Sequence, residues 1–431
     1  MASRGRKAKP KVQQRDLSSL DIVRQILPLR NWLVERSVIA GTQPHGNTAL
    51  READVLVLLL AGFYNPFVRS LRLMEQLSQL DWIRKHTALE RAPKSTLSDA
   101  LKRFNPEHLT PLIQELVKQL PSGVRTSEAT SLLEVGRQVI AADGSMFSLA
   151  GEVVWAMHRG GRPRTVERNG RPPAASDPYA VRLNLQLDVD TFLPTDLSVS
   201  GNTEGSEAAA FAKRIGGDAV YLVDRNFVHF GFLCAVLGAK SDFVVRLRKD
   251  TQFQSSQSLP LCARDKEASI LRDSAGVLSG DEGRTGPPPE QTLREVVVLD
   301  AKGEEMRLLT SLMDVPAWVI AELYRLRWQV ELFLRWLKVY NGYEHLMSQS
   351  HNGITTQFYV AVIGSLLMYI HTGQKPNRYA VMLLGQVAAG LATMEEILPM
   401  LERIQREKDL ERARLARKKA MVQKTDTSVA G

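Results

Sequence analysis

The first part of the chain repeats apolar residues at intervals of three and four positions. This spacing is close to the 3.6 residues of a helical turn, and it runs through residues 17–39, 53–63, 68–77 and 109–120. Ser95 and Thr96 precede a further helical stretch and offer it an N-cap. We therefore predict that residues 17–125 are helical. A plain helical bundle and a bundle that contains a helix-turn-helix give the same pattern.

Shorter apolar runs, typical of strands, replace this pattern beyond residue 136. Strands are predicted at residues 139–142, 179–188, 192–199, 219–223 and 243–247. Helices are predicted between them, at residues 208–215 and 231–237. This order predicts an α/β layer built on a mixed sheet. Residues 250–292 are then rich in Ser, Gly and Pro, two strands are predicted at 294–299 and 306–312, and the chain is predicted to be helical from residue 315 onward.

Composition narrows the class of protein. The 431 residues are 44% hydrophobic and 24% charged, which fits a soluble globular chain of about three domains and excludes a disordered or fibrous one. Two cysteines cannot cross-link a secreted fold. The longest apolar stretches, at 55–63 and 358–370, are shorter than the roughly 18 residues of a membrane helix. We therefore expect a cytoplasmic protein with no membrane segment.

The net charge of +9 is concentrated at the two ends of the chain. Residues 1–16 and 402–424 each carry a net charge of +5, and the rest of the chain carries −1. Basic tails favour contact with nucleic-acid phosphates and speed association. Solvated tails without a partner have the same composition, so charge alone favours nucleic acid without establishing it.

Three carboxylates are the candidates for chemistry. Asp143 and Asp224 each follow an apolar strand, and ligands of α/β proteins bind beyond such strand ends. Asp is also common at the start of a turn after a strand, so either residue alone could have only that role. The third, Glu331, lies on the predicted helix 317–340. With about 100° of rotation per residue, this helix places Tyr324 and the cations Arg327, Arg335 and Lys338 on the same face as Glu331, beside an apolar stripe. A salt-bridged surface helix would also place Arg327 four residues before Glu331.

Together the three carboxylates suit a pair of hard cations. Mg²⁺ binds through oxygen ligands, and two such ions can activate a water or a 3′-hydroxyl for attack on a phosphate. Arg327 and Lys338 would then hold the phosphate, and their charge would keep Glu331 ionised.

The spacing Tyr324-x2-Arg327-x3-Glu331-x6-Lys338 resembles the Tyr-Arg-Glu-Lys helix of DDE transposases from bacterial insertion sequences, in particular the insertion sequence four family. Residues 139–145 and 221–227 are similar to the segments that carry the two aspartates of that family, and the resemblance covers about 136–375. It implies that Asp143, Asp224 and Glu331 are catalytic and bind two Mg²⁺ ions, for which Mn²⁺ would substitute. It also implies that Tyr324, Arg327 and Lys338 contact the transposon ends.

The resemblance further implies a multidomain α/β protein with a ribonuclease-H-like core, a mainly β insertion and helical terminal regions. The expected parts are a basic arm (1–16), a helical DNA-end-binding domain (17–125), the first part of the core (136–249), the insertion (250–312), the second part of the core with the glutamate helix (313–375), and a helical C-terminal region with a basic tail (376–431).

The expected function is cut-and-paste transposition, in which the enzyme cleaves DNA at the ends of its element and joins the 3′-hydroxyls to target DNA. The expected partners are double-stranded DNA and a second copy of the chain in the DNA complex, for which the apolar face of residues 381–398 offers a surface. No phosphate-binding loop for ATP is present in the sequence, and a nucleoid-associated protein is expected.

Two alternatives remain open. One is a non-catalytic DNA-binding relative, and the other is a ribonuclease-H-like nuclease that does not transfer strands. The family often uses a tryptophan of the insertion to hold a flipped base, but residues 250–312 contain none, so the route of excision is also open.

Overall fold

The computed structural model describes residues 29–35, 50–64, 68–87, 89–120, 130–149, 155–158, 179–201, 205–279, 287–300, 302–339 and 346–372, with parts of 379–414. The expected basic arm, the end of the basic tail and half of residues 381–398 lie outside these residues. The chain divides into two compact units. One comprises residues 1–120 and 359–431, and the other comprises residues 121–358.

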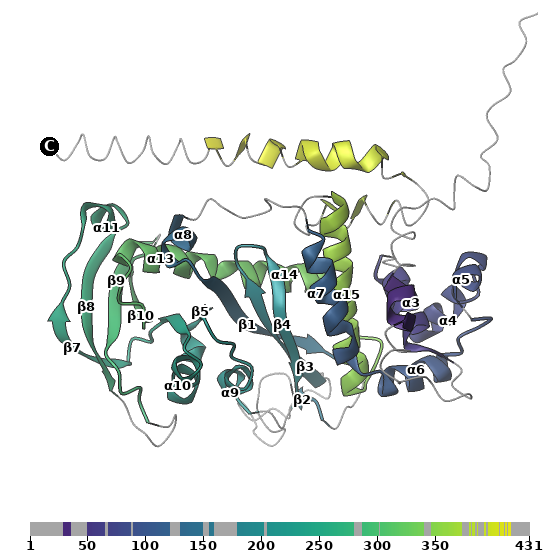
Figure 1. Cartoon of the computed structure of the whole chain (residues 1–431), viewed down its shortest axis with the longest axis horizontal. Coiled ribbons are helices and arrows are strands. Elements are labelled where there is room, and N and C mark those ends of the chain that lie inside the picture. Colours follow the sequence, from purple (N-terminus) through teal and green to yellow (C-terminus); the bar gives the residue numbers. More distant parts are fainter. Residues whose placement is uncertain are drawn as a thin grey trace, which may run out of the picture. The chain divides into compact units, whose positions relative to one another are not determined.

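The secondary-structure elements described in the first unit are helices (Figure 1). Its N-terminal part contains residues 29–35 in helical conformation and then α3 (Glu52–Phe63), α4 (Leu71–Leu77), α5 (Asp81–His86), α6 (Lys94–Arg103), the 3-10 turn η1 (Pro106–Leu109) and α7 (Thr110–Lys118). The cap predicted for α6 is wrong, because the helix begins one residue before Ser95 and Pro93 occupies the N-cap position without a side-chain hydrogen bond. An extended proline suits that position, since the first turn of a helix needs no amide there.

The longest helix, α15 (His351–Thr372), has residues in both units. Its residues 351–370 are long and apolar enough to cross a membrane by length and composition, which corrects the shorter estimate from the sequence. However, 94% of the window is buried inside the protein, as in the core helix of a soluble domain.

One mixed sheet forms the centre of the second unit (Figure 1). Its strands are β1 (Gln138–Ser148), β2 (Met157–His158), β3 (Tyr179–Asp188), β4 (Leu193–Ser200), β5 (Ala219–Val223), β6 (Asp242–Arg246), β7 (Gln252–Ser258), β8 (Ile270–Ser279), β9 (Leu293–Leu299) and β10 (Glu305–Thr310). Their order is β2-β3-β1-β5-β6-β10-β9-β8-β7, and β4 pairs with β3. β1, β5 and β6 are parallel, whereas β3 is antiparallel to β1. This mixed α/β arrangement is consistent with a ribonuclease-H-like domain.

The strands of the segment 250–312 extend the same sheet, because β10 pairs with β6. The strands β7 and β8 and the short helix α11 (Ala263–Glu267) were not predicted. β7 is polar and exposed along most of its length, so it lacks the apolar alternation that marks a strand in a sequence.

Alternate residues of the central strands face two different helical layers. Ile140, Tyr221 and Val245 point to the side that packs on α9 (Glu207–Ala212) and α10 (Phe230–Gly238). Residues one position further along each strand point to the other side, where α13 (Ala317–Leu326) and α14 (Trp328–Val339) pack on the strands. The candidate aspartates belong to this second set.

The helix predicted at 317–340 is two helices. Arg327 forms the junction, and the amides of Arg327 and Val330 bond to carbonyls only three residues back, Tyr324 and Arg327 respectively. This tighter turn separates α13 from α14. The predicted apolar stripe is largely buried, but Phe333 and Trp336 are buried as well, so α14 has apolar contacts on two sides. The polar face that carries Glu331 is correspondingly narrow.

Candidate active site

Strand register brings the two predicted aspartates to the same level. β1 and β5 pair in parallel as far as Ala141 and Leu222, so two residues further on Asp143 comes opposite Asp224. β5 and β6 pair as far as Val223 and Val245, so the next residue places Arg246 opposite Asp224. Asp143 lies within β1 rather than at its end, which corrects the prediction. The strand continues because residues up to Ser148 pair with β3 after the pairing with β5 has ended.

Local hydrogen bonds orient both aspartates. The amide of Gly144 donates to Asp143 Oδ1 at 2.9 Å. Asp224 caps the 3-10 turn η2 (Arg225–Phe227), where its Oδ1 accepts from the amide of Asn226 at 2.8 Å and its Oδ2 accepts from the Asn226 side chain at 3.2 Å. Both carboxylates therefore keep lone pairs for a further partner.

Burial and neighbouring carboxylates perturb Asp143 strongly. Burial raises its pKa to about 7, the charges of Glu207 and Asp224 add to the rise, and Arg327 opposes it. A carboxyl group with this pKa, just beyond the point where the pairing of two parallel strands ends, is typical of a functional site.

The third predicted carboxylate, Glu331, forms an ion pair. Arg327 Nη2 donates to Glu331 Oε1 at 2.6 Å, across one turn of helix. The same guanidinium lies 5.6 Å from the centre of the Tyr324 ring. Burial raises the pKa of Tyr324, as does Asp224, whereas Arg327 and Arg246 lower it. Tyr324 and Arg327 thus share the electrostatic environment of the aspartates, and Glu331 is linked to it through Arg327.

Lys338 lies further along α14. Its Nζ is 5.0 Å from the centre of the Phe147 ring, so it reaches the C-terminal half of β1. Arg335, the third cation of the predicted face, is exposed and lies 5.6 Å from the ring of Trp328, which is itself 48% exposed.

Glu207, for which the sequence predicts no role, lies in the same region. Ser206 caps α9, and its Oγ accepts from the amide of Ala209 at 3.2 Å, so Glu207 is the first residue of the helix. An acidic residue directly after a capping serine is a recognised signal for a helix start, but we had predicted the helix from residue 208. Burial raises the pKa of Glu207 as well, with Arg182 opposing the rise and Asp224 adding to it.

The region offers single ligand groups for a divalent cation and a phosphate, but its described carboxylates are not gathered into one complete metal site. Within the described parts of the chain, no three carboxylate, histidine or cysteine side chains lie close enough together to hold one metal ion, and Glu331 is paired with Arg327. The buried polar atoms of the described residues that have no hydrogen-bond partner include the acceptor Glu207 Oε1 and the donor Arg327 Nε. A cation would satisfy the first and a phosphate oxygen the second.

The pKa of Asp143 makes a prediction about stability in the absence of metal. Its folded-state pKa lies above the ordinary 3.8, so the unfolded state ionises first as the pH rises. Asp143 therefore destabilises the fold progressively between about pH 4 and pH 7 and by a constant amount above. We expect Asp143→Asn to raise the free energy of unfolding by roughly 2–4 kcal/mol at pH 8 and to leave it unchanged below pH 4. Chemical denaturation in chelator at several pH values measures this.

A matched control is Asp314→Asn, which alters an exposed aspartate of the same unit. It should change the free energy of unfolding by less than about 0.5 kcal/mol at every pH. A stabilisation by Asp143→Asn that did not depend on pH would contradict the assignment.

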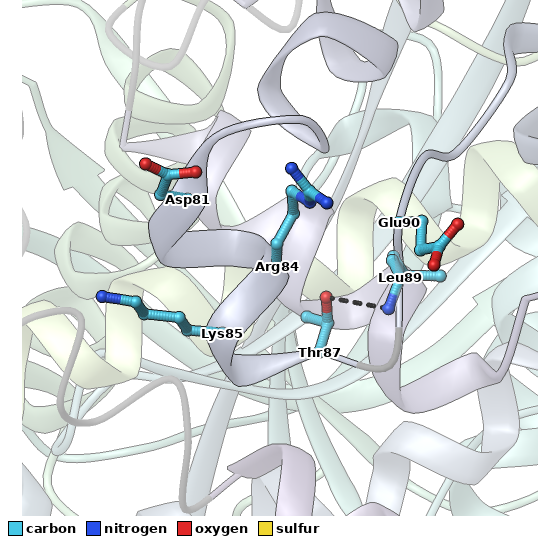
Figure 2. Close-up of a pocket in the computed structure, with 6 residues that line it drawn as sticks. All are labelled: Asp81, Arg84, Lys85, Thr87, Leu89 and Glu90. Atoms are coloured by element: carbon cyan, nitrogen blue, oxygen red, sulfur yellow. Dashed lines mark hydrogen bonds between the residues drawn. The ribbon is translucent and has the colours of Figure 1, made fainter.

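A cavity of about 410 Å³ lies in the other unit, beside α5 (Figure 2). Its lining contains Asp81, Glu90, Arg84 and Lys85, and Thr87 Oγ accepts from the amide of Leu89 at 3.4 Å. Two acidic and two basic side chains give it no net charge with which to select a phosphate or a cation. It is therefore not the candidate active site.

Comparison with known proteins identifies the family of the segment that contains these residues. The family model described as a transposase DDE domain matches residues 134–367. A putative transposase of Sinorhizobium fredii, y4zB, is 26% identical over 190 residues, which is 44% of this chain and 53% of the relative. A probable transposase for insertion sequence element IS5377 of Geobacillus stearothermophilus is 25% identical over 218 residues, which is 49% of this chain and 56% of the relative. The chain thus covers little more than half the length of these relatives.

Proposed function

The chain belongs to the transposase DDE domain family, and from this premise we propose that it is a DNA transposase of the insertion sequence four family. It would cleave DNA at the ends of its element and join the freed 3′-hydroxyls to target DNA. The observation that carries the proposal is the register of β1, β5 and β6, which aligns Asp143, Asp224 and Arg246 on the sheet face covered by α13 and α14.

The proposed metal ligands are Asp143, Asp224 and Glu331. Bound divalent ions, Mg²⁺ in the first instance, would activate the attacking oxygen and stabilise the leaving one. The two aspartates come from neighbouring strands and need little rearrangement, because each is already oriented by a backbone amide. The like charges that raise the pKa of Asp143 are those that a cation would neutralise.

Arg327 is the proposed link between DNA binding and completion of the site. It now donates to Glu331, and its Nε has no partner among the described residues. A phosphate is a stronger partner for a guanidinium than one carboxylate oxygen, since it offers two acceptors in bidentate geometry. Phosphate binding by Arg327 would release Glu331 toward the aspartates, so the site would be completed only on DNA.

The proposed partners are double-stranded DNA and, in the DNA complex, a second copy of the chain. The basic tails, at 1–16 and 402–424, would add affinity for phosphates without sequence preference. Lys338 would contact the DNA backbone beside β1, and Tyr324 would position the transposon end.

The experiment that tests the proposal uses the full chain and DNA that carries the ends of the element. Incubation with Mg²⁺ should nick the DNA at the element boundary, and addition of a plasmid target should give joined products. Binding to the ends without nicking, in Mg²⁺ or Mn²⁺, would favour the non-catalytic alternative. Nicking without joining would favour the nuclease.

Substitution of Arg327 and Lys338 tests whether these two cations contact phosphate or only stabilise the helix. We expect Arg327→Ala to weaken binding to end DNA about tenfold, since it removes charge-assisted hydrogen bonds. We expect Lys338→Ala to reduce the slope of log binding constant against log salt concentration by about 1. Fluorescence anisotropy over a salt series measures both.

Arg335→Ala is the control, because this cation lies on the same helix but is exposed. It should leave affinity and slope within twofold of wild type. If Arg327→Ala and Lys338→Ala also bound like wild type at every salt concentration, the ion pair of Arg327 with Glu331 would be a helix salt bridge only.

A further inference from the structure

We propose that three cations beyond the carboxyl ends of β5 and β6 bind the backbone of target DNA. These residues are Arg225, Arg248 and Lys249, and we call them the basic edge. The inference rests on the proposed function, because it assumes that an element end is joined to a target at the two aspartates.

The basic edge lies beside the second aspartate. Arg225 directly follows Asp224 and begins the turn η2. β6 ends at Arg246, so Arg248 and Lys249 leave the sheet at the end of the neighbouring strand. β5 and β6 are parallel, so their carboxyl ends lie at the same edge of the sheet. The Nε of Arg248 donates to the carbonyl of Arg225 at 3.2 Å, which links the two segments directly.

A hydrogen-bonded turn holds Arg248 and Lys249 in place. The amide of Thr251 donates to the carbonyl of Arg248 at 3.2 Å. Arg307, on β10, donates from Nη1 to the carbonyl of Thr251 at 3.0 Å and to that of Arg248 at 3.5 Å. Its Nε donates at 2.7 Å to Oε1 of Glu295, which is buried. The turn is therefore anchored to the sheet, and its backbone needs little ordering when a partner binds.

The side chains of the basic edge are exposed. Within the stretches that the structure describes, none of the three forms an ion pair with a carboxylate. Asp250 is the one acid of the turn 248–251, so the turn and Arg225 together carry three positive charges and one negative charge. Exposed cations on a fixed backbone suit the phosphates of duplex DNA, which they contact without reading base edges.

The position of the basic edge favours the target over the element end. Joining brings two DNA segments to the aspartates, because the 3′-hydroxyl of the end attacks a phosphate of the target. Lys338, a proposed contact to the end, reaches Phe147 on β1, and α14 packs on β1 and β3. In the strand order β3-β1-β5-β6, that side is separated from the basic edge by β5, which Asp224 follows. Target DNA on the basic edge would thus approach Asp224 from the other side.

The test measures binding of target DNA without catalysis. The full chain is first loaded with cut-end DNA, which stops at the 3′-hydroxyl and has no flank. It is then titrated, without divalent metal, against a labelled random-sequence duplex. We expect Arg248→Gln with Lys249→Gln to bind this duplex at least about tenfold more weakly and to lower the slope of log affinity against log salt concentration by about 2. Arg225→Gln alone should lower the slope by about 1. Fluorescence anisotropy measures both.

The control is the double variant Lys213→Gln with Lys240→Gln. Both lysines are exposed and lie in the connections that lead into β5 and β6, at the opposite ends of these strands. The variant loses the same charge as the double variant of the basic edge, but it should bind the duplex within about twofold of wild type. Unfolding midpoints should be unchanged in both double variants, since only exposed side chains are replaced.

The flanking donor DNA has the same phosphates as the target, and two further measurements separate the sources. With cut ends and Mg²⁺, the double variant of the basic edge should need about tenfold more plasmid for half-maximal joining, with the same distribution of insertion sites. Its affinity for cut ends and its nicking of uncut, flanked ends should stay within about twofold of wild type.

The outcomes distinguish this inference from the proposed function. Unchanged binding of the random duplex, or an equal loss in the lysine control, would overturn the inference alone. A loss confined to cut ends or to the nicking of flanked ends would assign the basic edge to the element end or to the donor flank, and would also overturn it. If the variants lost the random duplex as expected but the wild-type chain joined no DNA in Mg²⁺ or Mn²⁺, the surface would stand and the joining reaction would be overturned.

Discussion

Asp143→Asn, Asp224→Asn and Glu331→Gln are each expected to reduce nicking of end DNA at least about a thousandfold. Each change keeps the shape of the side chain but removes the negative charge that a metal ligand needs, and loss of one member of a catalytic unit costs nearly as much as loss of all. Binding to end DNA should stay within about threefold of wild type, since these residues are not proposed to contact phosphate. Gel assays for nicking and anisotropy for binding measure the two effects separately.

The control for these variants is Glu305→Gln, at an exposed glutamate of the same unit. It should nick DNA at the wild-type rate. Retention of near-normal nicking by any one of the three variants would remove that residue from the site. Loss of nicking together with loss of binding in all three would show damage to the fold instead of loss of a ligand, and the unfolding midpoints identify that case.

Arg294→Met is expected to lower the free energy of unfolding by about 3–5 kcal/mol, the largest stability effect that we predict. Arg294 is 4% exposed and donates two hydrogen bonds to Asp273, which is 2% exposed, at 2.8 and 2.6 Å. It also donates to the carbonyls of Leu312 and Val315, just before α13. Its removal would leave a buried carboxylate and two carbonyls without their donor.

The double variant Arg294→Met with Asp273→Leu distinguishes the pair from the packing around it. Replacing both charges with apolar groups removes the unpaired carboxylate, so we expect the double variant to be more stable than Arg294→Met. Urea denaturation followed by circular dichroism measures both. If the double variant were no more stable than the single one, the carbonyl contacts of Arg294 would account for its effect.

The same network positions part of the candidate site. Asp265, at the start of α11, accepts a hydrogen bond at 2.8 Å from the amide of Trp318, in the first turn of α13. Together with Arg294, it anchors the helix that carries Tyr324 and leads to Arg327. The strands predicted as an insertion thus support the helices of the site, which residue types alone did not indicate.

Local pattern in the sequence determined most of the elements around the site. β3 and β5 have the predicted ends, and α10 and β6 differ from prediction by one residue at each end. β3 alternates apolar and polar residues, and β5 and β6 are short runs rich in valine, which favours strands over helices. The spacing from Tyr324 to Lys338, with Asp143 and Asp224 upstream, also indicates the transposase family, and the match to residues 134–367 confirms that family.

The tertiary structure alone decided how these residues meet. Asp143 and Asp224 are level because of strand register, and register depends on contacts between residues about 80 positions apart. Glu207 lies beside Gly144 of β1 because α9 packs against the strands there, which no local pattern encodes. The break at Arg327 likewise arises where one helical stretch packs against two parts of a twisted sheet: α13 on β5 and β6, and α14 on β1 and β3. The sequence by itself thus specified the chemical groups and their elements, and packing over long sequence distances specified which of those groups act together.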